Sequence, residues 1–206
     1  MDFSPRQLAA LAIATSFAAG VNVYATVATL GLLARFNVIE LPASLSVVAE
    51  NWAIASASAL FLVEFIADKV PFFDLVWNAL QTFVRVPVAA LLAYGAASHL
   101  SPADQLLIAA LGSVVALAAH SGKMAARVAV TPSPEPFSNI ALSFGEDVFA
   151  VFLTWLATKH PFIAAAIALV LVVAIVAVAR VVVRVLRSVF RGAGRQVRST
   201  APTAGP

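Results

Sequence analysis

The 206-residue chain has no cysteine, only three histidines and two tyrosines, and few charged residues, which make up 11% of the total. The absence of cysteine excludes disulfide bonds, thiolate metal sites and cysteine nucleophiles. Soluble domains carry about 25% charged residues. With 62% hydrophobic residues and a mean hydropathy of +0.96, the chain is therefore predicted to be an integral membrane protein in contact with a lipid bilayer.

The excess positive charge is not spread as it is in nucleic-acid-binding proteins. Six arginines near the C-terminus supply about half of all Lys and Arg, and without them the chain is slightly acidic. They are Arg180, Arg184, Arg187, Arg191, Arg195 and Arg198. Arginines directly after an apolar helix are typical of its cytoplasmic end. We therefore expect no nucleic-acid partner and, for an even number of membrane spans, both termini in the cytoplasm.

Six membrane helices are predicted from the apolar runs and the residues that separate them. Their approximate ranges are 4–35, 51–68, 74–97, 102–130, 138–159 and 161–190. A hydroxyl residue followed by proline begins the first and the fourth, as at many helix N-termini. A connector at 36–49 and a proline-rich turn at 131–139 lie between helices. The fold class is thus an all-α membrane protein.

Two landmarks recur in the same order in the two halves of the chain. Ser4-Pro5 and Ser101-Pro102 each begin a helix, and residues 67–72 (ADKVPF) are similar to residues 157–162 (ATKHPF). Because each half has three helices, the halves insert in opposite orientations, as in many transporters. The sequence predicts two inverted three-helix repeats, 1–100 and 101–190, and a disordered cytoplasmic tail, 191–206. Chance similarity between alanine-rich helices is the alternative explanation.

Charged side chains gather at a few places inside these apolar segments. Glu64, Asp68, Lys69 and Asp74 lie within eleven residues of one another. A charged side chain at the centre of a membrane helix costs about 2.5 to 3.5 kcal/mol on insertion scales unless it is paired or hydrated. Such residues therefore mark a binding site or a set of structural ion pairs.

Further polar side chains follow one another at helical spacing, so each group shares one helix face. We predict a substrate- or ion-binding site between the repeats. Its candidate residues are Asn22, Glu64, Asp68, Lys69, Asp74, Arg85, His120, Lys123, Arg127, Glu146 and Asp147. Paired carboxylates beside a lysine and a histidine are suited to proton relay or cation binding. The alternative is that Lys123 and Arg127 only neutralise Glu146 and Asp147.

Two of these residues have simpler explanations as well. Asn22 lies beside Gly20, which favours close helix packing or a polar contact between helices. His120 has no second histidine at ligand spacing, so a hydrogen bond inside the bundle is favoured over a metal site. We expect no metal ion and no cofactor.

The chain lacks the sequence motifs of the P-loop, the zincins, the serine hydrolases and the dinucleotide-binding proteins. We therefore predict that it is not an enzyme. The favoured function is small-solute or ion transport, with proton coupling as one form of it. The alternative is a scaffold or accessory subunit whose buried charges are structural. A bundle of 206 residues has little room for a gated path, so a homo-oligomer is expected, and a scaffold would bind another membrane protein.

Several segments are together similar to one known family. They are AGVNVYAT at 19–26, EFIADKVPFFD at 64–74, the residues His120, Lys123 and Arg127, SPEPFSN at 133–139, and Glu146-Asp147. Over about residues 10–185 the chain resembles the family catalogued as domain of unknown function 4126, most specifically at 64–74. The resemblance implies a multi-helix protein of the bacterial inner membrane. It implies no activity, substrate or cofactor.

Overall fold

A computed structural model describes residues 3–70, 73–130 and 136–199, and this part of the chain is helical without any β-strand. The all-α prediction is confirmed. The elements are α1 (Pro5–Val21), α2 (Val23–Arg35), the 3-10 helix η1 (Ala43–Ala49), α3 (Asn51–Ala67), α4 (Phe73–Ala96), α5 (Pro102–Val130), α6 (Pro136–Lys159) and α7 (Pro161–Ser199).

Four of these helices are long and apolar enough to cross a membrane. The spans are Val76–Ala96, Pro102–Val130, Phe137–Lys159 and Pro161–Val185, and η1 with α3 forms a fifth if their 59° bend lies within one span. The protein is therefore a multi-pass membrane protein, as the composition predicts. The predicted count of six spans is not confirmed, because the first predicted helix is broken.

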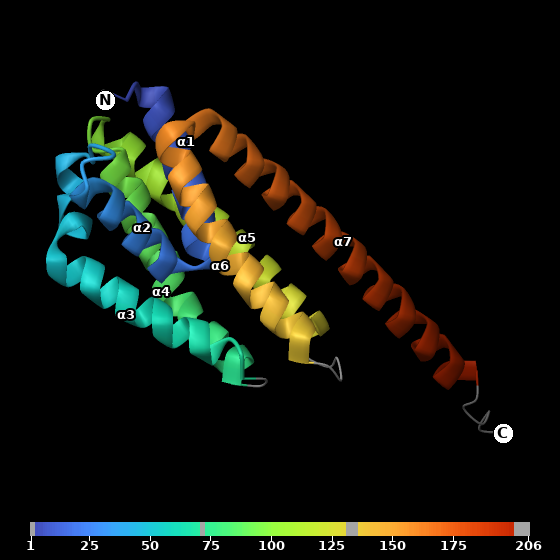
Figure 1. Ribbon diagram of the computed structural model, residues 1–206. Coiled ribbons are helices and arrows are strands. Elements are labelled where there is room, and N and C mark those ends of the chain that lie inside the picture. The colour runs from blue at the N-terminus through green and yellow to red at the C-terminus, as the bar shows by residue number, and fades with distance from the viewer. Residues whose placement is uncertain (1–2, 71–72, 131–135, 200–206) are drawn as a thin grey trace, which may run out of the picture.

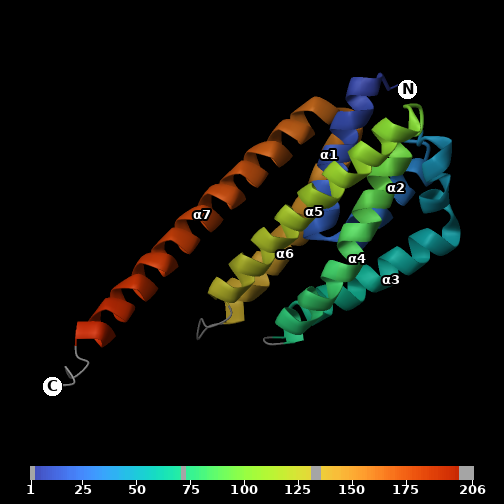
Figure 2. The ribbon, with the colours of Figure 1, turned by 180° about the vertical axis from the view of Figure 1, so that it is seen from behind.

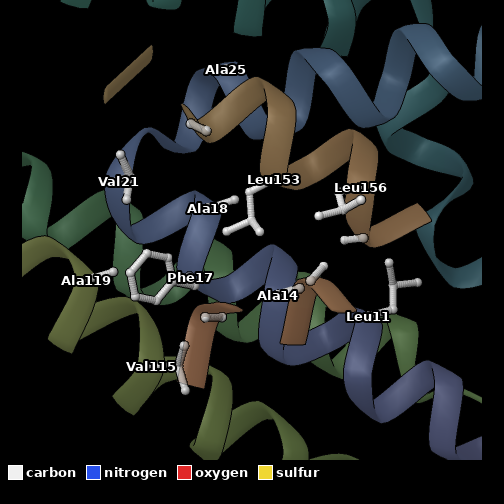
Figure 3. Close-up of a cluster of buried hydrophobic side chains, with 14 residues drawn as sticks. Leu11, Ala14, Phe17, Ala18, Val21, Ala25, Val115, Ala119, Leu153 and Leu156 are labelled. Atoms are coloured by element: carbon white, nitrogen blue, oxygen red, sulfur yellow. The ribbon is translucent and has the colours of Figure 1, made fainter. Parts of the chain in front are cut away.

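That break lies at Asn22, where we expected one helix from residue 4 to 35. Asn22 has an extended backbone (φ −149°, ψ 104°), and its side-chain oxygen accepts a hydrogen bond of 2.9 Å from the backbone N–H of Ala25. Asparagine ends helices in this way because its side chain competes with the backbone for hydrogen bonds. The chain reverses here, and α2 runs back beside α1 (Figures 1 and 3).

Contacts after α2 show which end of the bundle the chain returns to. The ammonium of Lys159, at the end of α6, donates to the carbonyl oxygen of Val38 at 3.2 Å. The hydroxyl of Ser44 donates to the carbonyl oxygen of Gly95, near the end of α4, at 2.7 Å. Helices α1 and α2 therefore form a hairpin that makes no net crossing of the bundle.

The position of the termini follows from this hairpin. The first turn of α1 and the last turns of α7 lie at opposite ends of the molecule (Figures 1 and 2). The expectation that both termini share one side rested on a continuous first helix, and the structure does not support it. The inverted repeat is not confirmed either, because α5 is continuous where the first half has α1 and α2.

Helix α1 lies at the centre of the bundle and contacts α4, α5, α6 and α7. Its N-terminus carries the predicted cap, in which Ser4 and Gln7 exchange side-chain and backbone hydrogen bonds. Leu11 and Ala18 of α1 share the apolar core with Leu153 and Leu156 of α6, and Phe17 lies beside Ala119 of α5 (Figure 3). Small residues on α1 let neighbouring backbones come close.

Two helix ends differ from the predicted ones. Helix α6 begins at Pro136 and not near residue 138, since proline is well accommodated in the first helical turn; residues 131–135 lie outside the described part of the chain. Helix α7 continues to Ser199, beyond the end near residue 190 that the sequence predicts. Arginine is a good helix former, and the arginines here recur every three or four positions along one face.

Candidate functional site

Nine of the eleven predicted site residues meet beside the α1–α2 break, where polar faces of α4, α5 and α6 converge on the end of α3. We call them the charged cluster, and all but one are buried, the exception being Glu146, whose side chain is 12% exposed. The members are Asn22, Glu64, Asp68, Arg85, His120, Lys123, Arg127, Glu146 and Asp147.

Glu64 on α3 binds two cations at once. Its Oε1 atom forms an ion pair with the guanidinium of Arg85 on α4 and accepts from the ammonium of Lys123 on α5 at 3.2 Å. The side chains of Glu64 and Arg85 are fully buried. Removing either partner would leave an uncompensated buried charge, which is strongly unfavourable.

A second set of ion pairs surrounds Arg127 on α5. Its Nη2 atom lies 3.0 Å from Asp68 Oδ2 and 2.6 Å from Glu146 Oε2, and Lys123 lies 3.1 Å from Asp68 and 3.6 Å from Glu146. The two cations of α5 thus connect the end of α3 to α6. The predicted neutralisation of Glu146 is confirmed, but neither cation pairs with Asp147.

The end of α1 also takes part in the charged cluster. Arg85 donates to the carbonyl oxygen of Gly20 at 3.4 Å, and Lys123 donates to that of Val21 at 3.3 Å. The last carbonyl groups of a helix have no partner within it and carry partial negative charge. Two cations therefore satisfy the carbonyl groups that the break leaves open.

Asn22 connects the break to α6. Its Nδ2 group donates to Asp147 Oδ1 at 2.8 Å, while its own Oδ1 caps α2. The other carboxylate oxygen of Asp147, Oδ2, is buried and has no hydrogen-bond partner in the described structure. The same is true of the Ser143 hydroxyl, one turn earlier on α6.

The hydrogen bonds of His120 fix its tautomer. Its Nδ1 lies 2.9 Å from Arg85 Nη1, which can only donate, so Nδ1 accepts. The ring proton is then on Nε2, which donates to Thr82 Oγ1 at 2.8 Å. His120 is neutral in this arrangement, in keeping with the predicted hydrogen-bonded role inside the bundle.

Two predicted residues do not join the charged cluster. The ammonium of Lys69 donates to the carbonyl oxygen of Phe65 at 2.7 Å and lies 3.0 Å from the centre of the Phe65 ring. Partial burial lowers the pKa of Lys69. The side chain of Asp74, in the first turn of α4, lies outside the described residues.

Three further polar residues form hydrogen bonds with members of the charged cluster and were not among the predicted site residues. Asn78 donates to Asp68 and accepts from Arg85, Asn139 accepts from Arg127, and Thr82 holds His120. Asn78 lies on the same helical face as Arg85, a signal present in the sequence. Asn139 is the last residue of the proline-rich turn predicted at 131–139 and shows no such helical spacing, since its partner Arg127 lies on another helix.

A cavity of about 290 Å³ reaches this cluster from one side, between α1, α5, α6 and α7. Lys123 and Glu146 line it together with apolar residues such as Phe17, Phe149 and Ile175. Helix α7 diverges from α5 and α6 toward its C-terminal end (Figures 1 and 2). Among the described residues no three acidic, histidine or cysteine side chains converge as they would on a metal ion.

The fold and the charged cluster define a class: a multi-pass helical membrane protein with mutually paired buried charges at a helix break. Residues 9–181 match the family described as Domain of unknown function (DUF4126), and the chain belongs to that family. No curated protein matches the chain. No solved structure matches it either.

Proposed function

We propose that this protein is a membrane transporter that moves a small solute or an ion past the charged cluster. The broken helix α1–α2 is the observation that carries the proposal. Discontinuous helices whose open backbone groups meet charged residues near mid-bilayer form the substrate and ion sites of many secondary transporters. Here the carbonyl groups of Gly20 and Val21, together with the side chain of Asn22, lie among buried charges.

Access to the cluster supports the same proposal. Lys123 and Glu146 lie at the wall of the 290 Å³ cavity, whose remaining lining is apolar. Binding sites with this composition use a few polar groups to orient a ligand and apolar surface to hold it. A solute that carries a charge or a strong dipole would compete with the ion pair between Lys123 and Glu146, which is the longest in the cluster at 3.6 Å.

A scaffold function is the second candidate, and the ion pairing itself favours it. Every carboxylate of the charged cluster except Asp147 is already paired with a cation. Buried ion pairs between helices can fix their arrangement without any transported ligand. The two candidates differ in whether water and solutes reach Lys123 from both sides of the membrane.

The transporter would have a defined orientation in the membrane and would assemble as an oligomer. The arginines at the C-terminal end of α7 favour the cytoplasmic side of a bacterial inner membrane for that end of the molecule. Helix α7 exposes many valines between residues 170 and 185, such as Val170, Val173 and Val178. In an oligomer that covers this surface, a neighbouring copy would supply part of the wall of a transport path that a single copy forms only incompletely.

Substituted cysteines test the transport proposal, and the chain has no cysteine of its own to interfere. Ala126 lines the cavity and is half-buried, so Ala126→Cys reports on water access beside Lys123. In sealed proteoliposomes, a transporter is expected to react with a membrane-impermeant thiol reagent added to either side. Ala116→Cys is the control, because Ala116 is fully buried against α1 and should not react.

A scaffold gives a different result in the same experiment. Ala126→Cys would then react from one side at most, and no panel of protons, alkali cations or small organic ions would cross the vesicle membrane faster than in protein-free vesicles. Glu146→Gln also distinguishes a transporter from a scaffold, since it removes a charge from the cavity wall. A transporter loses flux through this change, while the exposed Glu50→Gln leaves flux unchanged.

A further inference from the structure

The charges of the cluster do not balance among the described side chains. Three cations, Arg85, Lys123 and Arg127, pair with three carboxylates, Glu64, Asp68 and Glu146. Asp147 is a fourth carboxylate, 4% exposed, and it makes no ion pair with any described residue. His120 adds no positive charge, because its Nδ1 accepts from Arg85.

The surroundings of Asp147 offer one uncharged donor and one open position. Asn22 donates to Oδ1 at 2.8 Å, and Oδ2 has no partner in the described structure. Ser143 lies one helical turn earlier on the same face, and its buried hydroxyl is likewise without a partner there. An ionised carboxylate with one neutral hydrogen bond is poorly stabilised in an apolar bundle, whereas a carboxylic acid can use its O–H as a donor.

The charged groups that face Asp147 come from several elements. They are Lys123 from α5, Glu64 from α3, and Asp68 and Lys69 from the turn after α3. Helices α1 and α2 contribute only the uncharged Asn22. Lys69 is the remaining candidate counter-ion, but its ammonium is held by the carbonyl oxygen and ring of Phe65.

We propose that Asp147 carries one exchangeable proton, bound at Oδ2 and directed toward Ser143, and that this proton makes the charged cluster electrically neutral. The step is simple protonation: Oδ2 takes a proton from water to form an O–H bond, and releases it to water again. A proton fits the site better than an alkali metal ion, which needs several converging oxygen ligands. At Asp147 the open oxygens are its own Oδ2 and the hydroxyl of Ser143. Glu64 Oε2 also lacks a partner in the described structure, but Glu64 is already paired with two cations through Oε1.

The inference deepens the proposed transport function, because it names the ion to which transport would be coupled. The physiological role of the proton rests on the proposed transport function, but the proton itself can be detected whether or not the protein transports anything. Asp147 lies beside the α1–α2 break and next to Glu146 in the chain, so a change in its proton occupancy acts directly on Asn22. Helix breaks that contact a protonatable carboxylate are suited to such coupling.

Infrared spectroscopy of the full-length protein in lipid vesicles tests the proposal. A protonated carboxyl group shows a C=O stretching band that carboxylates lack. We expect this band at neutral pH in the natural chain, its loss at alkaline pH, and its absence in Asp147→Asn. Glu50→Gln and Lys69→Gln should keep it, since the first residue is exposed at the other end of the bundle and the second is bound to Phe65.

Several results would overturn the proposal. These are the absence of the band in the natural chain, its persistence in Asp147→Asn, its strong increase in Lys69→Gln, or its removal by sodium ions at constant pH. If Asp147→Asn does not fold, Asp147→Glu serves instead, and an unchanged band frequency in that variant contradicts the assignment. The infrared and thiol-labelling experiments can fail separately. If the band has all these properties but Ala126→Cys reacts from one side at most, the proton site stands and the transport function is refuted.

Discussion

The ammonium of Lys123 on α5 lies 3.3 Å from the carbonyl oxygen of Val21, the last residue of α1. The same ammonium pairs with Glu64 and Asp68, at 3.2 and 3.1 Å. One side chain thus pairs with two buried carboxylates and donates to a carbonyl group at the open end of a broken helix. The break and the charged cluster are therefore a single arrangement, in which each part supplies partners that the other lacks.

Asn22→Ala should destabilise the protein strongly, although the change removes only a small side chain. The change removes the cap of α2 and leaves Asp147 Oδ1 without its donor. Losing an N-cap costs about 0.5 to 2 kcal/mol, and leaving a buried polar atom unsatisfied adds about 1 to 3 kcal/mol. Thermal unfolding in detergent measures the loss. Ser4→Ala removes an exposed cap on α1 and is the matched control, with a smaller effect. Equal stabilities of the two variants would contradict the role of Asn22.

Gly20→Ala and Gly145→Ala should have opposite effects. A Cβ atom at Gly20 would lie against the backbone of Ala116 and 2.8 Å from the Cβ of Ala119, so α1 and α5 must move apart. Overpacking of this kind costs about 1 to 3 kcal/mol. Gly145 is on α6 with no neighbouring atom within 4 Å of the new Cβ. Alanine there should stabilise the helix by about 0.5 to 1 kcal/mol. Thermal unfolding of both variants decides whether the α1–α5 contact is as close as described.

The sequence predicted the membrane class, most helix positions and the family, because long apolar runs and proline positions are local signals. It did not predict the break at Asn22. The residues from 8 to 33 are mostly apolar, and asparagine is tolerated inside many helices. The break depends on partners distant in sequence, such as Asp147 and Lys123, which stabilise the open helix end. The first predicted span differs from the observed α1 and α2 because of that one residue.

The residues of the charged cluster were easier to predict than the path of the chain. Buried charges in an apolar chain are conspicuous in sequence, and nine of the eleven candidate residues meet in the structure. Their pairing was not predictable, since helix spacing shows which residues share a face but not which faces meet. Lys69 illustrates this: it follows Asp68 directly, yet it binds Phe65 and not a carboxylate.

Glu64→Gln should destabilise the protein. Glu64 pairs with both Arg85 and Lys123 while fully buried, so its neutralisation leaves two cations with one partner fewer. Breaking a buried pair costs about 3 to 5 kcal/mol. The double variant Glu64→Gln with Arg85→Gln removes both members of one pair. Its loss in unfolding free energy should be smaller than the sum of the two single losses. Additive losses would show that the pair does not contribute as described.

The opposite positions of the termini can be tested with two single cysteines. Arg6 is exposed in the first turn of α1, and Ser188 is exposed on α7, beyond the span that ends at Val185. Because α1 and α2 form a hairpin, an odd number of crossings separates these positions if η1 and α3 cross together. An impermeant thiol reagent added outside sealed, uniformly oriented vesicles should therefore label Arg6→Cys or Ser188→Cys, but not both. The arginines that follow Ser188 favour the cytoplasmic side for α7, so inside-out vesicles should label Ser188→Cys. Labelling of both cysteines from one side would show an even number of spans, and would refute either the hairpin or the joint crossing of η1 and α3.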